Sequence, residues 1–138
     1  DLEPGKWAKL GGWEGAEAAE ATVQAGFAAF DDLTLAEDER PALAALTGQE
    51  QLAARAVVWA RKEAVLKATG HGLVVDPSSI VVSAPDVDPA LVDWRAAETA
   101  PAAVRLLDVP LADARHRAAV AVLSDDDVTL TRLGDVLR

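Results

Sequence analysis

The residues of this sequence best suited to chemistry lie in one short polar segment. Glu63 stands between two lysines, Lys62 and Lys67, and glycines follow at Gly70 and Gly72. A glutamate offers the hard oxygen ligand that Mg²⁺ prefers, and lysines offer point charges for phosphate oxygens. Glycines lack a Cβ and let a phosphate-bearing ligand approach the backbone closely. The combination suggests a site for a metal ion and for the phosphate that the ion bridges.

The same segment also has an ordinary structural interpretation. Trp59, Glu63 and Lys67 are spaced four apart, so a helix places them on one face. A glutamate–lysine pair at this spacing is a common surface ion pair, and a tryptophan commonly packs a helix against a sheet. Spacing alone therefore leaves the chemical and the structural interpretations open.

A long helix is expected to position these side chains. Apolar residues recur at helical spacing from about residue 50 to residue 69, among them Leu52, Val65 and Leu66. Gly70 follows the last of them, where a helix commonly ends in a left-handed residue. This is the clearest element that the sequence predicts.

Two further helices are predicted before it. The alanine-rich stretch from residue 14 to residue 30 has acidic residues near its start, and two aspartates break it. Thr34 can then cap a second helix, with Glu37 completing a capping box and Gly48 ending it.

The character of the sequence changes after Gly72. Short β-branched or alternating runs follow one another between turn residues, at 73–75, 80–82, 104–107, 118–123 and 128–131. Because helices come first and strands afterwards, the expected class is α+β, with helices packed on an antiparallel sheet. No linker or repeat divides the chain, so residues 1–138 are predicted to form a single domain.

Composition excludes several classes of protein. Half of the 138 residues are hydrophobic (51%), which excludes a disordered chain. There is no cysteine, and hence no disulfide and no thiolate metal site. The net charge is −10, from 13 Lys+Arg against 23 Asp+Glu. Nucleic acid and anionic lipid both attract a positive field, so neither they nor a membrane is an expected partner.

The chemical segment resembles a known family signature. Trp59 to Leu73 reads W-x-x-K-E-A-x-x-K-x-x-G-x-G-L, which is similar to the signature helix of the 4′-phosphopantetheinyl transferases. Asp1-Leu2-Glu3 resembles the acidic strand motif of the same family, and residues 30–43 resemble the stretch between the two motifs. The resemblance spans nearly the whole chain.

The resemblance implies an activity and a site. These enzymes move 4′-phosphopantetheine from coenzyme A to a serine of a carrier protein. It implies that Asp1, Glu3 and Glu63 hold Mg²⁺ and that Glu63 is the candidate base. It also implies that Lys67 and Lys62 bind phosphate, and that Lys67 acts in catalysis by stabilising charge on the phosphates or by protonating the leaving group. Three carboxylates at one site would repel one another without a cation, which is a physical reason to expect a metal.

The branch of the family follows from two details. Trp59 and the compact D-L-E spacing resemble the larger surfactin-type enzymes, which are pseudo-dimers of two similar halves. The chain is then expected to be the C-terminal half, with little activity without its N-terminal half, and to be cytoplasmic. Two alternatives stay open: an intact small holo-carrier-protein synthase active as a homotrimer, and a non-catalytic interaction domain of the same fold.

Other polar residues carry weaker interpretations. His71 and His116 are too isolated to build a metal site, although His71 could reach a ligand beside the glycine turn. Arg117 is predicted to cap a strand or face solvent. Arg55 and Arg61 are candidates for contact with an acidic carrier protein, or for ion pairs along the helix.

Overall fold

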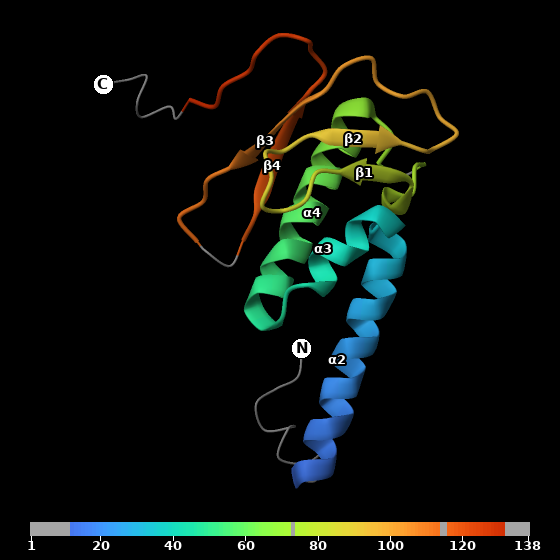
Figure 1. Cartoon of the computed structure of the whole chain (residues 1–138), viewed down its shortest axis with the longest axis vertical. Coiled ribbons are helices and arrows are strands. Elements are labelled where there is room, and N and C mark those ends of the chain that lie inside the picture. Colours follow the sequence, from blue (N-terminus) through green and yellow to red (C-terminus); the bar gives the residue numbers. More distant parts are fainter. Residues whose placement is uncertain (1–11, 73, 114–115, 132–138) are drawn as a thin grey trace. The chain divides into compact units, whose positions relative to one another are not determined.

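The computed structural model describes residues 12–72, 74–113 and 116–131 (Figure 1). Asp1 and Glu3 lie outside these residues. Internal contacts divide the chain into two compact units, Asp1–Leu33 and Thr34–Arg138. No helix in the described part of the chain is long and apolar enough to cross a membrane.

The first unit contains helix α2 (Gly12–Thr34), whose last residue belongs to the second unit. Its alanine-rich composition explains the helix, because alanine has the highest intrinsic helix propensity. The predicted break at the two aspartates is wrong: the helix continues through Asp31 and Asp32. Aspartate is only a weak helix former in an interior, not a terminator.

The second unit opens with a 3₁₀ turn and a short helix in place of the predicted longer one. The turn η2 spans Glu37–Glu39 and α3 spans Arg40–Ala44, with a proline in the first turn of α3. The predicted capping box at Thr34 and Glu37 is also wrong. The Oε1 atom of Glu39 accepts the backbone N–H of Ala36 at 2.7 Å instead.

Helix α4 (Gly48–Thr69) is the central element of the second unit and confirms the predicted long helix. It ends at Gly70, whose φ of 76° lies in the left-handed region. The N–H of His71 then reaches back to the carbonyl of Leu66 at 2.9 Å. These contacts satisfy carbonyls that the helix end leaves without partners.

Two separate antiparallel hairpins follow α4, not one sheet. In the first, the 3₁₀ turn η3 (Pro77–Ser79) leads into β1 (Ile80–Val82), which pairs with β2 (Leu91–Trp94). In the second, β3 (Arg105–Val109) pairs with β4 (Ala118–Val122). The class is therefore α+β as predicted, but within the described residues the single sheet is corrected to two two-stranded sheets. Figure 1 shows both hairpins beside α4.

Two strand assignments from the sequence are wrong, and one strand was missed. Residues 128–131 form no strand, and β2 was not predicted. Val74 and Val75 lie in a turn, because both of their N–H groups donate to the carbonyl of His71 at 3.0 Å. The turn after the helix uses the backbone N–H groups that a strand would need for pairing.

The core of the second unit lies between one face of α4 and the hairpins. Its members are buried aliphatic side chains, chiefly Leu43, Val58, Val65, Leu66, Ile80, Val82 and Leu106. Each such side chain stabilises the fold by about 1.5–3 kcal/mol when fully buried. The burial fixes the rotation of α4 and so decides which of its polar residues reach solvent.

Candidate functional site

A groove between α4 and β4 contains the main sequence-predicted residues. Trp59, Glu63 and Lys67 line it from the helix. Its volume is about 440 Å³. The helical spacing brings Glu63 and Lys67 together as expected, with Oε2 and Nζ 3.6 Å apart. Trp59 is 37% exposed and lines the groove opposite β4.

Small side chains keep this groove open. Ala56, Ala60 and Ala64 form a row along α4, and Ala118 and Ala119 line the groove from β4. Because none of these side chains extends beyond Cβ, the helix and the strand leave space between them. The groove therefore presents an apolar floor below polar walls.

Lys62 lies on a different face of α4. Its side chain is 0% exposed, and its amine pairs with the carboxylate of Glu39. The same amine donates to the carbonyls of Thr34 at 2.6 Å and of Pro77 and Ile80 at 2.9 Å each. Burial lowers the pKa of Lys62, and the Glu39 carboxylate opposes that shift. The structure does not bring Lys62 to the groove with Glu63 and Lys67.

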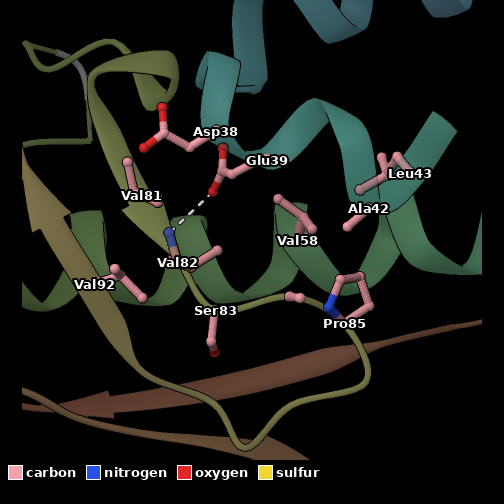
Figure 2. A pocket seen from close by; sticks show the side chains of 11 residues that line it. Asp38, Glu39, Ala42, Leu43, Val58, Val81, Val82, Ser83, Pro85 and Val92 are labelled. Carbon is pink, nitrogen blue, oxygen red and sulfur yellow. Dashed lines mark hydrogen bonds between the residues drawn. The ribbon is translucent and has the colours of Figure 1, made fainter. Parts of the chain in front are cut away.

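The partner of Lys62 ties two segments together. The Oε2 atom of Glu39 accepts the N–H of Val82 at 2.9 Å, as the dashed line in Figure 2 shows. Figure 2 also shows the second pocket, of about 240 Å³, which Glu39 and Asp38 line together with mainly apolar side chains. Because Glu39 is engaged by Lys62 and by two backbone N–H groups, it serves the fold at this point.

The three expected metal ligands are divided between described and undescribed residues. Glu63 is half-buried at the groove and offers carboxylate oxygens there. Asp1 and Glu3 lie outside the described residues. Among the residues that the structure describes, no group of three His, Asp or Glu side chains could hold a metal ion.

Comparison with known families identifies the family of this chain. Residues 16–122 match the model of the 4′-phosphopantetheinyl transferase superfamily. The chain belongs to this superfamily. No curated protein and no solved structure matches the chain. The matched range includes all of α4 and β4, and thus every residue that lines the groove.

Arg61 precedes Lys62 and is also buried. Its Nε and Nη2 atoms donate to Oδ1 and Oδ2 of Asp108, at 3.0 Å and 2.7 Å respectively. It also donates to the carbonyl of Ala84 at 2.9 Å. With 1% exposure, Arg61 cannot contact a carrier protein, so that candidate role is wrong. Arg55 donates to Gln51 at 3.1 Å, one turn away along the helix.

Sequence reasoning missed two residues of the groove, His116 and Arg117. They lie just before β4 and line the same groove as Glu63 and Lys67. The signal in the sequence was the basic character of this segment immediately before a strand, but nothing showed that the strand lies along α4. His71 is not at the groove; its ring packs against that of Trp94, with centroids 5.7 Å apart.

Proposed function

We propose that this phosphopantetheinyl transferase moves 4′-phosphopantetheine from coenzyme A to a serine of an acyl, polyketide or peptidyl carrier protein. The observation that carries the proposal is the pairing of Glu63 and Lys67 on the exposed face of the signature helix, at an open groove. A carboxylate and an ammonium group so placed suit proton transfer and phosphate binding at one site. Membership of the superfamily supports the reaction class.

Glu63 and Lys67 have complementary roles in this reaction. The serine Oγ attacks the β-phosphorus of coenzyme A, forming a new P–O bond, and the bond to 3′,5′-ADP breaks. The serine proton passes to the Glu63 carboxylate, directly or through a water. Lys67 neutralises charge on the phosphate oxygens or protonates the leaving group. The Lys67 side chain is 78% exposed, so its ion pair with Glu63 is weak and can yield to a phosphate.

The proposal assigns Mg²⁺ to Asp1, Glu3 and Glu63. The half-buried Glu63 carboxylate fits a hard cation, because it offers oxygen donors beside the phosphate-binding Lys67. When bound, the metal would neutralise the pyrophosphate and orient it for displacement. Lys62, also assigned to phosphate from the motif, would first have to exchange its four buried acceptors for a ligand.

The finer assignment is to the surfactin-type branch, with this chain acting as a C-terminal half in the cytoplasm. The support is the sequence pattern: Trp59 in the signature helix and the D-L-E spacing. The groove, open along α4, is compatible with a second half that completes the site. The chain alone is then expected to show little transfer, and transfer should rise when the N-terminal half of a surfactin-type enzyme is added.

The test follows the mass of an apo carrier protein incubated with coenzyme A and Mg²⁺. The incubation is run with the chain alone and with an added N-terminal half. Glu63→Gln should abolish transfer, because the amide cannot accept the proton and is a poor metal ligand. Glu50→Gln is the matched control, since Glu50 lies on the same helix in its first turn, away from the groove.

Two results would count against the assignment. Full activity of Glu63→Gln in the presence of Mg²⁺ would remove Glu63 from the mechanism. Robust activity of the purified chain as a monomer would remove the half-enzyme interpretation, while Mg²⁺-dependent activity of a homotrimer would favour the small-synthase alternative. A circular dichroism spectrum of each variant establishes that it is folded.

A further inference from the structure

We propose that His116 and Arg117 form an anion-binding wall of the groove, facing Glu63 and Lys67, and that they bind phosphate groups of a small ligand. The identity of that ligand as coenzyme A rests on the proposed function. The anion site itself rests on the placement and chemistry of these two residues, which the family signature does not include.

The register of β3 and β4 places His116 and Arg117 near Glu63 and Lys67 of α4. Ala119 of β4 pairs with Asp108 of β3, and Asp108 binds Arg61 of α4. The start of β4 therefore lies level with Arg61, two residues before Glu63 along the helix. His116 and Arg117 immediately precede β4, and both line the groove with Glu63 and Lys67.

The groove is less acidic than the chain as a whole. The chain carries a net charge of −10. The ionisable side chains that line the groove are Lys67, Arg117, His116 and a single carboxylate, Glu63. A second carboxylate, that of Asp113, lies beside the groove at 2.8 Å from the imidazole of His116. The two permanent cations of the lining outnumber its one carboxylate, which favours anions over cations there.

Local hydrogen bonds orient both residues. The Nδ1 atom of His116 lies 2.8 Å from Oδ2 of Asp113, and Arg117 Nη1 donates to the carbonyl of His116 at 2.9 Å. A protonated imidazole donates from both nitrogens, so it can hold Asp113 through Nδ1 and a phosphate oxygen through Nε2. A guanidinium is a planar fork that suits phosphate geometry.

The size of the groove favours a small phosphate-bearing molecule over a protein surface. A volume of about 440 Å³ lies within the usual range for small-molecule sites. An acidic carrier protein would dock on a broad exposed patch, whereas these cations line a concave groove with an alanine floor. Trp59, at the same groove, offers an aromatic face for the organic part of such a ligand.

The test is calorimetric titration of the full chain with three probes. The first probe, coenzyme A with Mg²⁺, contains both phosphate groups and the organic part of the ligand. The second, pantetheine, contains no phosphate. The third, inorganic pyrophosphate without Mg²⁺, contains only phosphate groups. Arg117→Ala should raise the Kd for coenzyme A and for pyrophosphate by about tenfold, the loss of one strong charge-assisted contact. His116→Ala should raise both by about threefold. Neither variant should change the affinity for pantetheine.

The matched control is Arg105→Ala. Arg105 lies on β3, the strand paired with β4, and its guanidinium donates to the carbonyls of Asp125 and Asp126, outside the groove. The control removes the same charge from the same hairpin, so long-range electrostatics alone would affect both arginine variants equally. Arg105→Ala should leave all three affinities unchanged.

The outcomes separate this inference from the proposed function. Unchanged coenzyme A binding in both groove variants, with transfer intact, overturns the anion wall and leaves the transferase. Arg117-dependent pyrophosphate binding by a chain that binds no coenzyme A supports the anion wall and contradicts the transferase. Weaker binding of an apo carrier protein, with unchanged phosphate binding, overturns the inference in favour of protein docking. Binding of none of the probes by the unsubstituted chain also overturns it.

Discussion

The two sides of α4 use the same residue types for opposite purposes. Lys62 and Lys67 are five residues apart, yet the first is 0% exposed and the second 78%. Lys62 holds Glu39 and three backbone carbonyls inside the fold, whereas Lys67 rests loosely on Glu63 at a groove. Position on the helix, and not side-chain chemistry, decides whether a lysine is buried in the fold or exposed at the groove.

The buried side also explains why the groove side is well oriented. Arg61 fastens α4 to β3 through Asp108, and Lys62 fastens it to η2 and β1 through Glu39 and Ile80. Two anchors at consecutive residues resist rotation of the helix about its axis. Glu63, the next residue, then points to the groove at a defined angle. A rigid supporting layer of this kind is what a precise catalytic geometry needs.

The largest expected effect comes from breaking the Lys62 anchor. Lys62→Ala leaves the Glu39 carboxylate buried without its counter-charge and leaves three carbonyls without a donor. The free energy of unfolding should fall by about 3–5 kcal/mol, as when one partner of a buried ion pair is removed. Urea unfolding measured by circular dichroism gives the value.

Lys67→Ala is the control for this contrast. It removes the same charge from the exposed side of the helix and should change the free energy of unfolding by less than about 0.5 kcal/mol. Equal destabilisation by the two variants would contradict the division of α4 into an anchoring and a ligand-binding side.

A smaller loss is expected at the second anchor. Asp108→Ala removes the carboxylate that binds Arg61, but three carbonyls, of Ser83, Ala84 and Val87, still accept from the guanidinium. Asp108 is 47% exposed, so solvent already screens part of the interaction. The free energy of unfolding should fall by about 1–2 kcal/mol. If the free energy of unfolding fell as much as in Lys62→Ala, the ion pair with Asp108, and not the three carbonyls, would hold Arg61 in place.

The end of α4 gives a comparable effect through the backbone. Gly70→Ala places a Cβ on a residue with a φ of 76°, although no atom lies within 4 Å of that Cβ. The cost is conformational strain alone, about 1 kcal/mol in the free energy of unfolding. Gly72→Ala is the matched control, because Gly72 has equally open space and no positive φ, and its stability should be unchanged or slightly higher.

The sequence predicted the elements that local patterns determine. The periodicity of α4 and its terminal glycine were sufficient for that helix, and the spacing of Glu63 and Lys67 was sufficient for their pairing. The burial of Lys62 was also readable in principle, since residues 58, 62, 65 and 66 share one helical face whose other members are apolar. The motif resemblance instead predicted a phosphate-binding role for Lys62.

The remaining features depend on contacts between distant residues. His116 joins the groove only because β4 lies along α4, and Glu39 is a partner of Lys62 across 23 positions. The split into two hairpins likewise depends on which strands pair. A pattern within a single segment does not encode these pairings, so propensity and spacing could not supply them.

The smallest expected effect concerns an exposed cation, Arg95, which binds Asp38 at 2.6 Å and Asp93 at 2.8 Å. Its hydrogen bonds and charge hold the pKa of both carboxyls below their ordinary value of 3.8. Because the folded-state pKa values are lowered, the stabilisation is present above that value and is lost as the pH falls through the lowered ones. Lys62, by contrast, holds its carboxylate away from solvent.

Urea midpoints of the unsubstituted chain and of Arg95→Gln should therefore differ slightly at neutral pH. They should begin to converge only below about pH 4, the ordinary pKa of aspartate, and coincide once the pH has fallen below the lowered pKa values. Arg105→Gln is the control, since Arg105 donates to two backbone carbonyls that do not titrate and lies 3.8 Å from the exposed carboxylate of Asp127. Most of its offset should persist through the same acid range. If the Arg95→Gln offset did not shrink on acidification, the two carboxylates would not be the source of its effect. The exposed ion pairs of Arg95 would then contribute no electrostatic stabilisation, in contrast to the buried ion pair of Lys62.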